Sequence, residues 1–160
     1  MSYTVIDLLD KAIVIAEKRK ELYNELAVKT MRNSSLYIFV NVFIKNTDRT
    51  IEYYKQLKSE ANNTNCEEIA FVVYDKISFL INEFNQKIFF LNNLSIKSLL
   101  KSSLDIEKDV LALFIDIQGR LVKSKEDTNT AAYKILSKVI IQKERNIKEL
   151  QSFIKTYSFQ

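Results

Sequence analysis

The sequence predicts an all-α protein, an antiparallel four-helix bundle, from three observations. The 160-residue chain has no proline and a single glycine, Gly119, so long helices can run uninterrupted while tight β turns become scarce. Four long segments carry apolar residues at helical spacing. Their apolar stripes repeat about every 3.5 residues, the spacing of helices that pack at a shallow angle. The length suits one domain, residues 1–160, with one core.

The first predicted hairpin spans about residues 4–61. Its first helix runs from about Val5 to Thr30 with Thr4 as N-cap, and its second from about Ser35 to Ala61. One face of each helix is expected to be buried. These faces consist of Val5, Leu9, Ala12, Ala16, Tyr23 and Leu26 in the first helix, and of Leu36, Val40, Phe43, Thr47, Thr50, Tyr54 and Leu57 in the second.

A long crossover, about residues 62–94, is predicted between the second and third long helices. ANNTN (61–65) breaks the helical pattern, and Asn65 with Glu68 has the spacing of a capping box. The rest, CEEIAFVVYDKISFLINEFNQKIFFL (66–91), is rich in aromatic residues and should contain one or two short helices. Its β-branched run FVVY leaves a strand as the alternative.

The second predicted hairpin spans about residues 95–157. Ser95 should cap the third long helix, and the polar loop KSKEDTNT (123–130) should lead into a fourth from about Thr130 to Thr156. The stripes expected to be buried contain Leu100, Ser103, Glu107, Val110, Phe114, Ile117 and Leu121 in the third helix, and Leu136, Val139, Lys143, Asn146, Leu150 and Phe153 in the fourth.

Each stripe is interrupted near its middle by small, polar or charged residues. The interruptions of the second and fourth helices lie 96 residues apart (143 − 47 and 146 − 50), and those of the first and third lie 91 apart (107 − 16). Loops can absorb this difference, so two hairpins packed about a pseudo-twofold axis would bring all the interruptions to one level of the core. The interrupting residues are Ala16 with Arg19, Thr47 with Thr50, Glu107, and Lys143 with Asn146.

Buried polar groups at a shared level are costly unless they satisfy one another. We therefore expect an ion pair between Glu107 and Lys143 inside the protein, with Arg19 as the alternative cation. Thr47, Thr50 and Asn146 should complete the hydrogen bonds around it. Two other interpretations stay open: Lys143 could reach solvent from a partly exposed seam, and the threonine hydroxyls could bond to carbonyls of their own helix.

Two segments resemble rubrerythrin-like members of the ferritin-like superfamily. SSLDIEKDVLALF (102–114) is similar to the family pattern A-I-x-x-E-K-D-x-x-x-x-Y, whose metal-binding glutamate corresponds to Glu107. DKAIVIAEKRKELYNELA (10–27) resembles the family's first helix, with Ala12-Ile13 and Leu22-Tyr23 at the expected places and Ala16 at the glutamate position. The resemblance extends over both hairpins and implies a ferritin-like bundle that forms a homodimer.

The family's second and fourth helices carry the motif E-x-x-H followed by an apolar run. IKNTDRTIEYYKQL (44–57) and IIQKERNIKELQSF (140–153) share this frame, with Thr47 and Lys143 at the glutamate positions and Thr50 and Asn146 at the histidine positions. In the family, four glutamates and two histidines hold a di-iron or related centre. Here only Glu107 keeps a ligand of that type, and the chain has no histidine.

These substitutions predict that the metal site is lost. A single carboxylate cannot hold two divalent cations, and the Lys143 ammonium would repel them. We therefore expect no catalytic residue, no bound metal and no cofactor. The leading hypothesis is a non-catalytic, metal-site-depleted bundle with a structural or partner-binding role.

Two other functions remain as alternatives. One is a divalent-metal-binding or di-iron oxidase-type protein with the unconventional ligands Glu107, Glu17 and Glu144, although Glu17 lies about 100° around the helix from Ala16 and should face solvent. The other is a binder of a small apolar ligand or lipid between helices. It requires a cavity, which no sequence feature indicates.

Composition argues against several partners and locations. The 24 basic residues alternate with 20 acidic ones, which indicates a solvated surface and no nucleic-acid site. Cys66 is the single cysteine, which excludes an internal disulfide. The first residues, MSYTVIDLLDKAI, do not resemble a signal peptide, and no stretch approaches the roughly 18 apolar residues of a membrane span. We expect a cytoplasmic homodimer, with another protein partner as a further option and the aromatic crossover as the contact surface.

Overall fold

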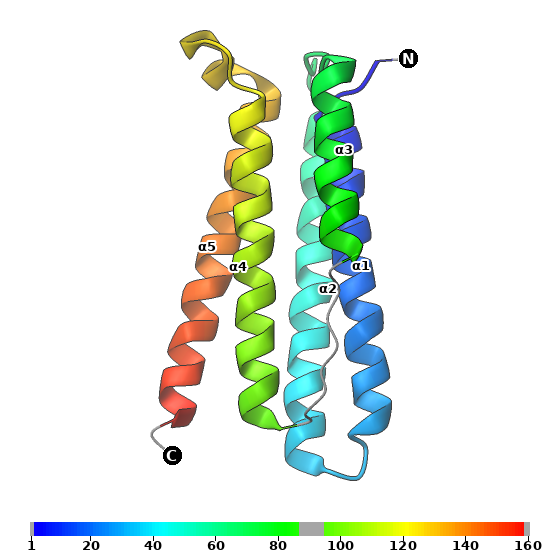
Figure 1. Ribbon diagram of the computed structural model, residues 1–160, viewed down its shortest axis with the longest axis vertical. Coiled ribbons are helices and arrows are strands. Elements are labelled where there is room, and N and C mark those ends of the chain that lie inside the picture. Colours follow the sequence, from blue (N-terminus) through cyan, green and yellow to red (C-terminus); the bar gives the residue numbers. More distant parts are fainter. Residues whose placement is uncertain (1, 87–94, 159–160) are drawn as a thin grey trace.

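The computed structural model describes residues 2–86 and 95–158, and this part of the chain is all-helical (Figure 1). In the described ranges no strand forms, and the one β-type contact is an isolated bridge between Tyr3 and Ile69. The all-α prediction is confirmed. The elements are α1 (Val5–Lys29), α2 (Ser34–Asn62), α3 (Phe71–Gln86), α4 (Ile96–Arg120), the short 3-10 helix η1 (Lys125–Asn129) and α5 (Ala131–Ser158).

Local capping groups define the starts of the long helices. The Thr4 hydroxyl accepts a hydrogen bond from the Ile6 backbone, and the Asp7 carboxylate accepts one from the Thr4 backbone. Ser95 likewise accepts one from the Ser98 backbone at the start of α4. The predicted caps at Thr4 and Ser95 are confirmed. Each satisfies backbone N–H groups that lack a partner in the first helical turn.

The crossover is organised differently from the prediction. The FVVY run belongs to α3, so the strand alternative is wrong, and residues 87–94 of the predicted crossover lie outside the described ranges. The capping box at Asn65 and Glu68 is also wrong, because the backbone N–H of Ile69 donates to the Tyr3 carbonyl and keeps this segment out of a helix. The neighbouring Glu67 carboxylate accepts a hydrogen bond from the Ala131 backbone at the start of α5.

The long helices form two antiparallel pairs, α1 with α2 and α4 with α5, that stand side by side (Figure 1). Helix α3 lies toward the end of the molecule that carries the N-terminus (Figure 1), where it contacts α4 and where its Tyr74 lies against Tyr3 and Lys11 near the start of α1. Buried apolar residues form two clusters, one containing Leu9, Ala16 and Tyr54 and the other containing Tyr23 and Phe43. Between the clusters the buried residues are polar or charged: Arg19, Thr47, Thr50, Ser103, Glu107 and Lys143.

Burial follows the predicted stripes except along the last part of α5. Every predicted stripe residue of α1 and α2 is buried, as are those of α4 up to Ile117. The predicted stripe of α5 is buried only as far as Lys143. Beyond it, Asn146 and Leu150 are half-buried, and Phe153 is 44% exposed. The prediction of a fully buried α5 stripe is therefore wrong, because these residues line an open pocket between α5 and α2.

Candidate functional site

Glu107 on α4 holds two cations, one on each carboxylate oxygen. Lys143 Nζ on α5 donates to Oε2 at 3.1 Å, and Arg19 Nη1 on α1 contacts Oε1. Arg19, Glu107 and Lys143 are only 7%, 9% and 1% exposed, so their charges are largely removed from water. The sequence offered Arg19 as an alternative to Lys143, whereas the structure places both on the carboxylate. We call Arg19, Glu107 and Lys143 the ion triad.

The pKa shifts reflect one carboxylate shared by two cations. Burial by itself would raise the pKa of Glu107, but Arg19 and Lys143 together hold it below its ordinary value. Burial is also the main reason that the pKa of Lys143 falls to about 8, an effect that the attraction to Glu107 only partly offsets. Burial would lower the pKa of Arg19 too, yet Glu107 and the neighbouring tyrosines raise it. At neutral pH the triad therefore carries one net positive charge, and Lys143 is the cation that loses its proton first.

Aromatic residues surround the ion triad. The Tyr54 ring centroid lies 5.9 Å from Lys143 Nζ, within the range of a cation–π interaction. The Tyr23 and Ser103 hydroxyls are hydrogen-bonded to each other at 3.0 Å. The sequence identified Ser103 as a stripe residue but gave no sign of this contact, because the two residues lie on α1 and α4, 80 positions apart.

The two threonines are buried near the triad but do not bond to it. Thr47 donates its hydroxyl proton to the Phe43 carbonyl at 2.8 Å, and Thr50 donates to the Asn46 carbonyl at 3.1 Å. The expectation that these hydroxyls complete the hydrogen bonds of Glu107 is wrong, and the alternative of bonding within their own helix is confirmed. The physical reason is that the carbonyl four residues earlier always lies within reach of a helical threonine hydroxyl.

The remaining predicted positions fall into two groups. Ala16 is buried in the apolar cluster next to the triad, and Asn146 is half-buried in the wall of the pocket. Glu17 and Glu144 are exposed, so the structure does not bring the unconventional ligand set together around Glu107. Within the described ranges, no three His, Cys, Asp or Glu side chains are grouped so that they could hold a metal ion.

A pocket of about 280 Å³ opens between α2 and α5 and reaches the ion triad. Its polar end, near the middle of the helices, includes Arg19, Arg49, Glu107 and Asn146. Its apolar end, toward the loop between α1 and α2, includes Tyr23, Phe39, Phe43, Leu150 and Phe153. Nothing in the apolar pattern singled out Arg49, which sits one position before a buried threonine and is an exposed residue in the pocket wall.

The chain was compared with protein-family models, with curated proteins and with solved structures. No family model, curated protein or solved structure matches the chain.

Proposed function

We propose that this chain is a ferritin-like four-helix bundle in which an Arg–Glu–Lys ion triad takes the place of a metal centre. In this proposal the α1–α2 and α4–α5 pairs are the two hairpins of the bundle, and the segment with α3 is the crossover. The protein acts without catalysis, as a structural or partner-binding component of the cytoplasm. The single cysteine, Cys66, is a free thiol, which fits a reducing compartment.

The observation that carries this proposal is the occupation of both Glu107 oxygens by protein cations. Of the six positions that would hold ligands in a rubrerythrin-like centre, Glu107 alone has a carboxylate, and that carboxylate has no free oxygen to offer a metal. A divalent cation would also meet the net positive charge of the triad in a poorly screened interior. The triad supplies inside the protein the positive charge that a metal ion would otherwise bring.

The first prediction is that the purified protein retains no iron, manganese or zinc. After incubation with each divalent ion and dialysis, elemental analysis should find well below one ion per chain, because one doubly paired carboxylate is a poor ligand set. Retention of one or two ions per chain would contradict the proposal.

A variant with the ligand positions restored tests the ferritin-like assignment itself. Ala16→Glu, Thr47→Glu, Thr50→His, Lys143→Glu and Asn146→His together should create a site that retains two divalent ions, provided that circular dichroism shows an intact helical protein. The matched control carries the same five residue types at exposed positions and should retain none. Failure of a folded five-fold variant to bind metal would show that these positions do not converge as the proposal requires.

The second prediction concerns a homodimer formed through α3. Three large apolar residues on this helix, Phe71, Val72 and Phe79, are more than 60% exposed, at 65%, 64% and 62%, while Ile77 and Ile81 on its other side are buried. Burying such a face against a second copy would remove apolar surface from water. Sedimentation equilibrium should show a dimer that Phe79→Asp converts to a monomer. Ile115→Asp on α4, where Ile115 is 50% exposed, is the control and should leave the dimer unchanged.

A further inference from the structure

We infer that the pocket between α2 and α5 binds a medium-chain carboxylate, a molecule with one anionic head group and an apolar chain of about eight carbons. This inference goes beyond the proposed function, because it assigns a small-molecule ligand to a site that the ion triad does not itself define. It rests on three features of the pocket: its polar and apolar residues are separated along its length, Arg49 at its polar end makes no ion pair with the described residues, and its size suits a small amphiphile.

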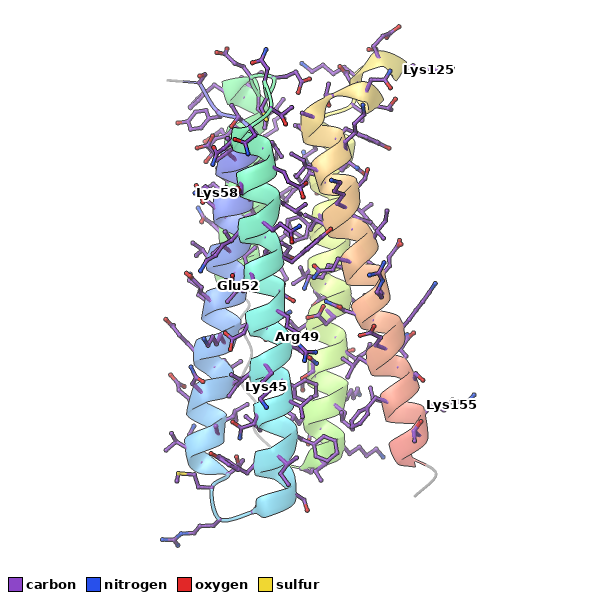
Figure 2. All side chains as sticks on the ribbon, turned by 180° about the vertical axis from the view of Figure 1, so that it is seen from behind. Lys45, Arg49, Glu52, Lys58, Lys125 and Lys155 are labelled. Atoms are coloured by element: carbon purple, nitrogen blue, oxygen red, sulfur yellow. The ribbon has the colours of Figure 1, made fainter. Side chains whose placement is uncertain are left out.

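The polar end of the pocket favours an anion. Arg49 extends from α2 toward the side on which α4 and α5 lie (Figure 2), and no ion pair joins it to a carboxylate among the described residues. Arg19 also lines the pocket, and its buried Nε has no acceptor in the described part of the chain. Glu107 is already paired with two cations, and the exposed Glu149 in the pocket wall makes no ion pair with Arg49. A carboxylate head group would therefore gain a charge-assisted hydrogen bond from Arg49.

The opposite end of the pocket favours an apolar chain. The Phe39 and Phe153 rings, from α2 and α5, lie 5.4 Å apart, and the Tyr23 and Phe43 rings lie 5.6 Å apart. Phe153 is 44% exposed, so a bound chain would cover apolar surface that now faces the opening. Burial of this surface supplies affinity, whereas the head group at Arg49 fixes the direction in which the ligand enters.

The dimensions of the pocket match a short amphiphile. Arg49 and Phe39 are ten positions apart on α2 (49 − 39), which corresponds to about 15 Å along the helix axis. The volume of about 280 Å³ is close to the lower limit of small-molecule pockets, roughly 300 Å³, so the pocket suits a ligand of about ten non-hydrogen atoms. Octanoate has this size and charge. A long lipid would extend beyond the pocket, and a cationic ligand would be repelled by Arg49 and by the net charge of the triad.

The test uses isothermal titration of the full chain with sodium octanoate below its aggregation concentration. Octanoate should bind with one molecule per chain, while octan-1-ol, octylammonium and acetate should bind at least tenfold more weakly, since each lacks one of the two matching features. Arg49→Gln should weaken octanoate binding about tenfold, the effect of losing one hydrogen bond to a charged group. Lys45→Gln on α2 removes the same charge one turn away, outside the pocket lining, and should change the affinity less than twofold.

A second pair of variants tests the location of the chain. Asn146→Phe should fill the pocket and abolish binding, whereas Gln151→Phe, at an exposed position on the same helix, should not. Circular dichroism will establish that both variants are folded, and Arg49→Gln tests the site without altering the core. The inference is overturned if octanoate does not bind, if octan-1-ol binds equally well, or if Arg49→Gln behaves like Lys45→Gln. Dissociation of a dimer by octanoate would also overturn it, because a second copy of the chain would then fill the pocket.

Discussion

Glu107→Gln is expected to lower the free energy of unfolding by about 3 to 5 kcal/mol, whereas Lys143→Met should lower it by about 1 kcal/mol or less. The asymmetry follows from the composition of the ion triad. Removing Glu107 leaves two buried cations, Arg19 and Lys143, without the carboxylate that they share. Removing Lys143 leaves Arg19 paired with Glu107 one to one and eliminates the excess positive charge. A simple ion pair would instead make the two substitutions about equally costly.

Urea denaturation of the single, double and triple variants measures this asymmetry. Arg19→Met, Glu107→Leu and Lys143→Met combined should be distinctly more stable than Glu107→Gln alone, since buried charged groups can be replaced by apolar ones of similar volume at little cost. The conservative exposed substitution Glu144→Gln on α5 is the control and should change stability by less than about 0.5 kcal/mol. Equal costs for Glu107→Gln and Lys143→Met, or strict additivity in the triple variant, would contradict the triad.

Raising the pH from about 8 to 10 is expected to stabilise the protein by about 2 kcal/mol, because the pKa of Lys143 is depressed in the folded state. In the folded protein Lys143 has a pKa of about 8, compared with an ordinary lysine value of 10.5. Between these values the unfolded chain holds a proton on Lys143 that the folded chain has lost. Deprotonation therefore favours folding, and stability rises with pH across this window.

The other buried groups set the limits of that window. Burial is the main cause that raises the pKa of Tyr23 and Tyr54, so the unfolded chain loses these protons first and stability should fall again above about pH 10. Glu107 sets the limit on the acid side, because its pKa in the folded protein lies below the ordinary value of 4.5. Its contribution to the free energy of unfolding is therefore fully present above about pH 4.5 and is lost as the pH falls through its lowered pKa.

Urea midpoints measured at intervals from pH 7 to 11 will check this prediction. The rise between pH 8 and 10 should disappear in Lys143→Met, which removes the group responsible, and should persist in Lys138→Met, where an exposed lysine on the same helix is replaced. A wild-type stability that is flat or falls over this range would show that Lys143 keeps its proton in the folded state.

The positions of the four long helices, and the buried faces of α1, α2 and most of α4, were predictable from the amino-acid sequence. The apolar stripes of α1 and α2 were predictable because a helical period is a local property, readable from residues three and four positions apart. The caps at Thr4 and Ser95 were predictable for the same reason, since each acts within one helical turn. The interruption of all four stripes also predicted a polar layer containing Glu107 and Lys143 in the core.

The pairing of those polar residues, in contrast, depends on how the helices pack against one another. Whether Glu107 pairs with Arg19, with Lys143 or with both depends on the rotation and separation of three helices to within about an ångström. The spacing of apolar residues along one helix carries no information on the distances between side chains of different helices. The pocket beside α5 has the same origin: Leu150 and Phe153 continue the apolar stripe, yet the space facing them is open. Sequence patterns predict which side chains each helix presents to its neighbours. Which of those side chains actually make contact depends on the packing between helices, because contact energies fall off within a few ångströms.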